Sequence, residues 1–165
     1  MNKRLFIVRH AKSSWDTPQL TDFERPLNNR GLRDVPDMSQ RFLESGYKID
    51  LLLSSPAERA IATAKGFAAK LEVPIHNIRQ KQGLYHASAF SIRRIIAGIP
   101  NDTQNVMVFG HNPGLTFLIN ELSNFYLDNL PTCAICGIEF NITSWKSVLN
   151  TEGNKFYYDF PKSRG

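Results

Sequence analysis

The stretch Leu5-Phe6-Ile7-Val8-Arg9-His10 decides the fold class of this chain, because a short apolar run ends in a guanidinium and an imidazole side chain. Apolar runs of this length are typical of buried β-strands. The pattern recurs where Leu51-Leu52-Leu53 is followed by Arg59, and where Val106-Met107-Val108-Phe109 is followed by His111. Ligands of open α/β sheets bind outside the carboxyl ends of the strands. We therefore expect the three strand ends to bring two arginines and two histidines to one place.

Helical patterns separate the apolar runs, and this alternation predicts βαβ units around a largely parallel sheet. Pro36 predicts a kink or a restart within the first helix, while Ser55 and Pro56 predict the N-cap and the first position of the second. The fold class we expect is an α/β three-layer sandwich, with a central, mostly parallel sheet flanked by helices, built as a single domain over residues 1–165. The expected helices cover 29–45, 57–71, 88–99 and 113–125, and the expected strands cover 4–8, 51–54, 75–78, 106–109, 134–140 and 155–160.

The bulk composition limits the class of protein. The chain has 165 residues, of which 42% are hydrophobic and 21% charged, as in a globular protein of one ordinary domain. The apolar run behind the basic N-terminus stops at Arg9, too soon for a signal peptide or a membrane span, so we expect a cytoplasmic protein that does not enter a membrane. The net charge of +5 fits a mildly basic protein or one that attracts acidic ligands. Nucleic acid is not an expected partner, because the basic residues are scattered.

The four residues at the strand ends have the chemistry that phosphoryl transfer requires. The planar fork of a guanidinium matches two phosphate oxygens at once, and a histidine can attack phosphorus as a nucleophile. Each residue alone is more often a surface charge or a satisfied histidine, but three strand ends that agree favour a site. We expect no cofactor and no metal, because no cluster of metal ligands is visible in the sequence.

For the two cysteines and the two other histidines, no such agreement between strand ends favours a functional role. Cys133 and Cys136 form a CxxC without a second pair, and positions three apart on a strand face opposite sides, so we expect buried structural thiols. His76 is expected to be solvated. His86 is a candidate for the rim of the pocket.

Four motifs in order along the chain resemble those of the histidine phosphatase superfamily, which has a phosphoglycerate mutase-like fold, and more narrowly its SixA-type phosphohistidine phosphatases. The resemblance makes His10 the residue that is transiently phosphorylated, with Arg9, Arg59 and His111 forming the phosphate pocket around it. It also makes Ser13, Asp16 and Asn112 candidates for contact with phosphate or substrate. Ala11 stands where most of the superfamily has glycine. The motifs are Arg9-His10-Ala11-Lys12-Ser13-Ser14-Trp15-Asp16, Arg25-Pro26-Leu27-Asn28-Asn29-Arg30-Gly31, Ser54-Ser55-Pro56-Ala57-Glu58-Arg59-Ala60 and Gly110-His111-Asn112-Pro113-Gly114.

One departure from the superfamily pattern bears on the substrate. Many members carry a carboxylic acid after the third strand, whereas this chain has Gly83-Leu84-Tyr85-His86-Ala87-Ser88 there. The remaining candidate acids are Asp16, Asp22 and Glu24, all in the first loop. A carboxylate at Asp16 would repel phosphate unless it were protonated or turned toward Arg25. An ion pair from Asp22 or Asp16 to Arg25 that holds the loop is favoured over catalysis.

These observations predict a metal-independent hydrolase, a phosphohistidine phosphatase that acts through phospho-His10 on a phosphorylated protein. An imidazole leaving group is easier to expel than an alkoxide, so the absence of a strong acid is tolerable for that substrate. The first alternative is a phosphomonoesterase that uses the same pocket on a small phosphorylated molecule. A phosphate-binding module without catalysis is the second alternative, and it would not require a nucleophile between arginines.

Overall fold

A single mixed sheet runs through the computed structural model, which describes residues 2–164. Its strand order is β3-β2-β4-β1-β5-β6. The strands from β3 to β1 pair in parallel, while β5 and β6 are antiparallel additions at one side. The expected mostly parallel α/β sheet is therefore confirmed. The strands are β1 (Asn2–Arg9), β2 (Leu51–Ser54), β3 (Ile78–Gln80), β4 (Asn105–Gly110), β5 (Ile135–Asn141) and β6 (Asn154–Asp159).

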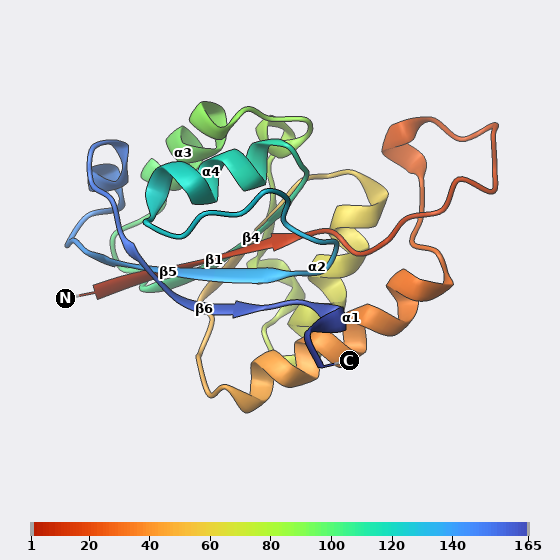
Figure 1. Cartoon of the computed structure of the whole chain (residues 1–165), viewed down its shortest axis with the longest axis horizontal. Helices are drawn as coiled ribbons and strands as arrows, with labels where there is room; N and C mark the ends of the chain where they lie inside the picture. Colours follow the sequence, from red (N-terminus) through yellow and green to blue (C-terminus); the bar gives the residue numbers. More distant parts are fainter. Residues whose placement is uncertain (1, 165) are drawn as a thin grey trace.

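Helices cover both faces of this sheet and make the three layers (Figure 1). The period-two alternation of β1 decides which face each side chain enters: Leu5 and Ile7 pack with α3 and α4, and Phe6 and Val8 pack with α1 and α2. The helices are α1 (Asn29–Glu44), α2 (Glu58–Lys70), α3 (Ala89–Ala97) and α4 (Gly114–Leu122), with short 3-10 helices η1 (Asp22–Glu24), η2 (Ile75–Asn77), η3 (Gln82–Leu84), η4 (Trp145–Leu149) and η5 (Pro161–Arg164).

Several expected boundaries are wrong. The N-cap of α2 is Ala57, because the hydroxyl of Ser55 accepts the Ala57 amide and bonds His111 instead of capping the helix. Helix α1 runs through Pro36 without a restart. The third strand starts only at Ile78, since the residues before it form η2, and α4 ends at Leu122, short of the expected 125.

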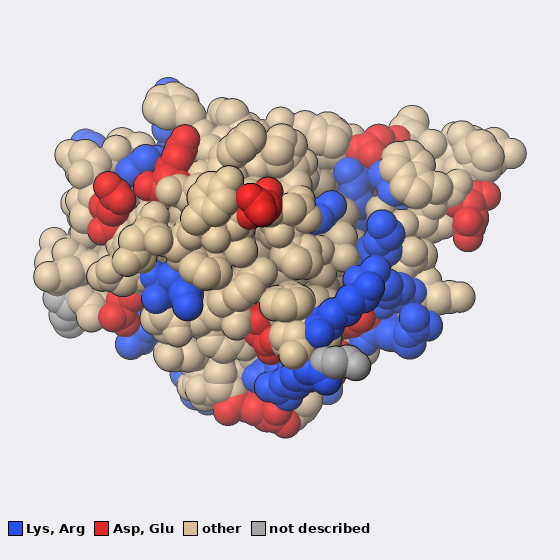
Figure 2. All heavy atoms as spheres, viewed as in Figure 1, with Lys and Arg blue, Asp and Glu red and all other residues tan. Residues whose placement is uncertain are grey.

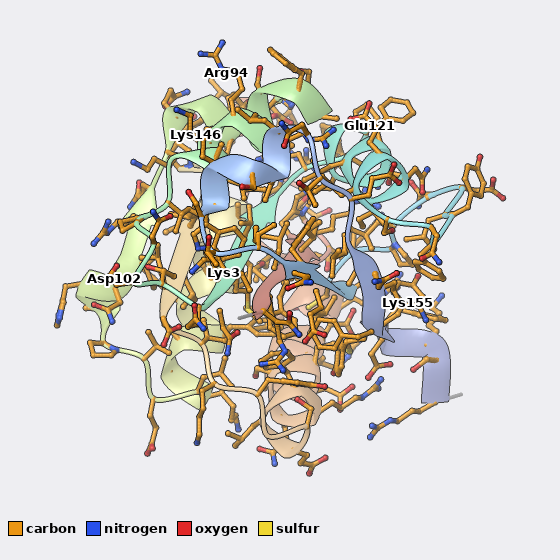
Figure 3. The ribbon with its side chains drawn as sticks, turned by 90° about the vertical axis from the view of Figure 1, so that its left-hand side faces the viewer. Lys3, Arg94, Asp102, Glu121, Lys146 and Lys155 are labelled. Atoms are coloured by element: carbon orange, nitrogen blue, oxygen red, sulfur yellow. The ribbon has the colours of Figure 1, made fainter. Side chains whose placement is uncertain are left out.

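The end of the sheet where β1 begins faces the viewer in Figure 3, with Lys3 near its centre. The buried ammonium of Lys3 donates to the carbonyl oxygens of Asn101 and Thr103 and to Oε1 of Gln104, at 2.7 to 3.1 Å. These bonds satisfy all three of its donors, so Lys3 has a structural role and leaves no charge free for a ligand.

Both cysteines are buried as expected, but Cys133 precedes β5 and has a φ of 61°, so the strand spacing that predicted their opposite faces does not apply to it. Cys133 packs in the core beneath α1 and α2, whereas Cys136 packs on the other face of the sheet, and both are free and buried. Burial raises the pKa of both thiols, which makes them unreactive. Within residues 2–164, none of the helices is long and apolar enough to cross a membrane.

Candidate active site

The carboxyl ends of β1, β2 and β4 place the predicted residues side by side. Arg9 is the last residue of β1 and pairs in register with Gly110, the last residue of β4. His10 and His111 follow these two residues directly, and their ring centroids are 5.1 Å apart. Arg59 lies in the first turn of α2, which leaves the same edge of the sheet after β2. The three strand ends therefore lie together, as expected.

His10 is oriented and kept neutral by its surroundings. Its Nδ1 lies 2.8 Å from the carbonyl oxygen of Ala11, which can only accept, so Nδ1 carries the proton and the lone pair is on Nε2. Burial, followed by the charges of the nearby arginines, lowers the pKa of His10 to about 4, although the bond to Ala11 opposes the shift. At neutral pH this imidazole therefore has a free lone pair for attack.

Three buried donors around His10 have no partner in the described residues: Nε of Arg9, Nε of Arg59 and Nδ1 of His111. Arg59 and His111 are only 3% and 4% exposed. An unsatisfied buried donor costs roughly 1–3 kcal/mol, and more where the group is charged, so such groups are rare without a functional reason. All three belong to residues that the superfamily resemblance assigns to one phosphate pocket.

The hydroxyl of Ser55 is placed to favour one tautomer of His111. Ser55 accepts the amide of Ala57 and has its own hydroxyl proton to donate to Nε2 of His111, 2.8 Å away. In that tautomer the unpartnered Nδ1 carries a proton that it can donate to a ligand. Burial first, then the proximity of His10 and Arg59, lowers the pKa of His111 to about 3. The ring is therefore a neutral donor at neutral pH.

Asp22, in η1, forms hydrogen bonds with more residues of the site than any single sequence motif indicates. Its Oδ1 accepts Arg25, while its Oδ2 accepts Nη2 of Arg59 at 3.0 Å, the hydroxyl of Tyr85 at 2.6 Å and Nε2 of His86 at 3.0 Å. Burial by itself raises the pKa of Asp22, but the bonds from Tyr85, Arg59 and Arg25 outweigh it and hold the pKa well below its ordinary value. Asp22 is thus an ionised anchor for the first loop and for Arg59.

Arg25 holds the first loop in place. Its guanidinium donates to the carbonyl oxygen of Ser14 at 3.0 Å, to the hydroxyl of Ser13 and to Asp22. The exposed ring of Trp15 stacks on the guanidinium, with the centroid 3.3 Å from Cζ. The expected ion pair between Asp22 and Arg25 is present, and Arg25 has few donors left for a ligand.

Comparison with known proteins agrees with this geometry. The model of the histidine phosphatase superfamily (branch 1) matches residues 5–82, which include Arg9, His10 and Arg59. Residues 5–82 of the chain therefore carry the sequence pattern of this superfamily. An uncharacterised chloroplastic protein of Arabidopsis thaliana is 29% identical over 164 residues, covering 93% of this chain and 73% of its own.

Solved structures of the superfamily share the fold over nearly the whole chain. The protein histidine phosphatase SixA, in a complex with tungstate, superposes with a TM-score of 0.84 at 21% identity, covering 98% of this chain and 99% of its own. A candidate phosphohistidine phosphatase SixA from Nakamurella multipartitia has a TM-score of 0.83 at 18% identity, covering 99% and 98%. A mycobacterial glucosyl-3-phosphoglycerate phosphatase is also similar, with a TM-score of 0.69 at 12% identity over 94% and 97%.

Of the other three candidate residues, Asn112 and Ser13 bond to other protein groups, and Asp16 is exposed. The amide of Asn112 donates to Oδ1 of Asn129 and to the carbonyl oxygen of Leu130, while its own oxygen accepts Thr116. The hydroxyl of Ser13 accepts Arg25. Asp16 is exposed and forms no ion pair among the described residues, so it is not turned toward Arg25.

Sequence reasoning underrated Tyr85 and His86. Both rings lie beside His111, with centroids 5.5 and 5.6 Å from it, so the segment after η3 forms a wall of the site. Gly114, at the start of α4, allows this approach, because a Cβ there would collide with the carbonyl oxygen of Ala87. A Gly at this position was the one sequence signal that could have indicated the contact.

Proposed function

We propose that this superfamily member is a metal-independent phosphohistidine phosphatase, which removes phosphate from a phosphorylated protein through a phosphohistidine intermediate on His10. One observation carries the proposal. Three buried donors, on Arg9, Arg59 and His111, lack partners within residues 2–164 and surround a neutral imidazole whose Nε2 lone pair is free. Donors without a nucleophile would support only the binding of phosphate. A nucleophile without these donors would lack the groups that hold phosphate and offset its negative charge.

The first half of the reaction transfers phosphate to His10. Nε2 of His10 forms a bond to phosphorus while the bond from phosphorus to the substrate nitrogen breaks. The substrate imidazole keeps the electron pair and leaves neutral, because its other ring nitrogen carries a proton, and His10 keeps the proton on Nδ1. Arg9 and Arg59 offset the charge of the transferred oxygens, and stabilisation of this charge is the main requirement of phosphoryl transfer. Because the charges of these arginines help to keep His10 neutral, the same groups prepare both the nucleophile and the pocket.

The preference for phosphohistidine rests on the ionised state of Asp22. The hydrogen bonds to Asp22 keep its carboxyl deprotonated, so it cannot donate a proton to an alkoxide. Glu24 is exposed and bonded to Thr21, and Asp16 is exposed as well. An imidazole leaves more easily than an alkoxide, and so suits a pocket without a protonated carboxyl.

The surface around the site supports a macromolecular partner. Trp15 is 73% exposed at the first loop. Figure 2 shows Lys and Arg side chains gathered over α1 and the C-terminal segment. Such a surface attracts an acidic protein that presents a phosphorylated side chain. Nucleic acid and membrane partners are not part of the proposal.

A small-molecule phosphomonoesterase is the second candidate, because the fold is shared with a phosphatase of glucosyl-3-phosphoglycerate. A substrate panel separates the two. The purified protein is incubated with a protein phosphorylated on histidine, with phosphoramidate, and with aryl and alkyl phosphate monoesters. We expect kcat/KM for the phosphohistidine protein to exceed that for alkyl esters by orders of magnitude. An alkyl ester that matches it would overturn the substrate assignment.

The intermediate is tested separately. We expect an acid-labile, alkali-stable phosphate on the native protein during turnover and none on the His10→Gln variant, which should also be inactive because no neighbouring group can replace the nucleophile. Activity in pure His10→Gln protein would refute the mechanism. A protein that binds phosphate without forming this adduct would be a binding module.

We also propose that residues 1–165 form one domain in the cytoplasm. A single sheet that uses strands from both ends of the chain supports the first part. The Arabidopsis relative is named chloroplastic, so location is to be tested by fractionation of the source cells.

A further inference from the structure

The side chain of His86 is held at the mouth of the site by contacts that no sequence motif indicates. Its Nε2 lies 3.0 Å from Oδ2 of Asp22, its ring stacks at 4.0 Å on Tyr85, and its centroid is 5.6 Å from that of His111. The backbone of His86 has φ of 51°, in the left-handed region that is uncommon for residues other than glycine. Residues kept in such conformations cluster at functional sites.

The contact with Asp22 determines which nitrogen of His86 can react. Asp22 is an ionised acceptor, so the Nε2 that faces it must carry a proton and donate it. The remaining lone pair is then on Nδ1, for which the described residues provide no hydrogen-bond partner. A histidine with one nitrogen donated to a carboxylate and the other free has the arrangement of a general base.

We propose that His86, oriented by Asp22, is the general base that activates water for hydrolysis of phospho-His10. The inference rests on the proposed function and deepens it, because it concerns the second half of the same reaction. Its side chain is 56% exposed, so both water and bulk proton acceptors reach it. Phosphate bound between Arg9, Arg59 and His111 would lie close to the His86 ring.

The oxygen of water forms a bond to phosphorus, the bond from phosphorus to Nε2 of His10 breaks, and His10 recovers its lone pair and becomes neutral. The proton of the attacking water passes to Nδ1 of His86, and the imidazolium that results is stabilised by Asp22. It later returns the proton to bulk water, and inorganic phosphate leaves.

The neighbouring groups are poorly suited to this task. Asp22 is engaged by Arg25, Arg59, Tyr85 and His86 and is a weak base. Tyr85 donates its only proton to Asp22, and burial together with that bond raises its pKa. His111 uses Nε2 on Ser55 and needs Nδ1 for the ligand. Among the described residues around the site, only His86 combines a carboxylate partner with a nitrogen that has no hydrogen bond.

The test separates the two half-reactions with phosphoramidate, which loads His10 without a protein partner. His86→Gly removes the imidazole and suits the positive φ, and His86→Asn also tolerates that conformation and keeps a side chain against Tyr85. In both variants we expect loading of His10 at near the native rate and loss of phosphate from His10 slowed about 10²-fold or more. Phospho-His10 should therefore accumulate in the steady state.

Two readouts distinguish a base from a merely structural residue. Added imidazole should restore dephosphorylation of His86→Gly, and the decline of the native hydrolysis rate toward acid pH should be absent from both variants. The groups that face His86 are Asp22, Tyr85 and His111, and they are unchanged in these variants. His76→Gly, a matched exposed histidine in η2, should behave as the native protein does.

Failure of the inference is distinguishable from failure of the proposed function. If the native protein never acquires phosphate on His10, the proposed function is wrong. If it does, and the His86 variants hydrolyse phospho-His10 at the native rate, or slow down without rescue by imidazole and without a change in pH profile, His86 is not the base.

Discussion

Replacement of His10 by glutamine should change the pH dependence of stability in a way that the burial of His10 dictates. The folded-state pKa of His10 is lowered to about 4 from the ordinary 6.5, so the unfolded chain binds a proton that the folded chain rejects. The native protein therefore loses stability as pH falls from about 6.5 toward 4, and the loss is absent above that window. Glutamine has no such proton to bind.

The magnitude follows from the shift. One pKa unit corresponds to about 1.4 kcal/mol, so the penalty on the native protein is about 2 kcal/mol near pH 5 and close to zero at pH 7.5. The lost packing of the ring adds a constant offset that does not depend on pH. Relative to its own value at pH 7.5, His10→Gln should thus gain about 2 kcal/mol over the native protein near pH 5.

Urea unfolding of both proteins at several pH values between 4.5 and 7.5 measures this difference. The buried His111 also titrates with a lowered pKa, but it is present in both proteins and largely cancels. Asp22 affects stability only at lower pH, because the stabilising contribution of its carboxylate is lost only as the pH falls below the ordinary pKa of an Asp side chain. A difference in unfolding free energy that stays constant over the whole range would show that His10 is not held neutral, and would refute the account of the nucleophile.

The remaining predictions concern the pocket. Arg9→Ala, Arg59→Ala and His111→Ala should each lower kcat/KM on the order of 10²-fold or more, since each removes a preorganised donor, and an unchanged steady-state rate would exclude that residue from the pocket. Asp16→Asn and Glu24→Gln should keep most of the activity on phosphohistidine, because neither carboxylate contacts the site; a large loss in the same assay would identify a missed acid. Incubation with EDTA should leave turnover unchanged, since no group of three or more His, Cys, Asp or Glu side chains within residues 2–164 is placed to hold a metal ion. Inactivation that is reversed by a divalent cation would contradict this.

The part of the fold that the sequence predicted is the part governed by local pattern. Apolar runs of strand length alternate with helical periods, and the carboxyl ends of parallel strands share one edge of a sheet. Arg9, His10 and His111 were therefore placed together without knowledge of any contact. Boundaries were less predictable where a side chain is used for another purpose, as the Ser55 hydroxyl is when it bonds His111 in place of capping α2.

Amino-acid order by itself predicted that Arg9, His10 and His111 lie at one edge of the sheet, because those positions depend only on strand direction and spacing, while the roles proposed for them come from the superfamily resemblance. Tertiary structure alone decided that Asp22, beyond its expected ion pair with Arg25, also bonds to Arg59 and His86, which are 37 and 64 positions away in the chain. It also decided that His86 faces the site, through the close approach of Ala87 to Gly114. Contacts between loops so far apart depend on the packing of the whole sheet and its helices, and no local periodicity encodes them.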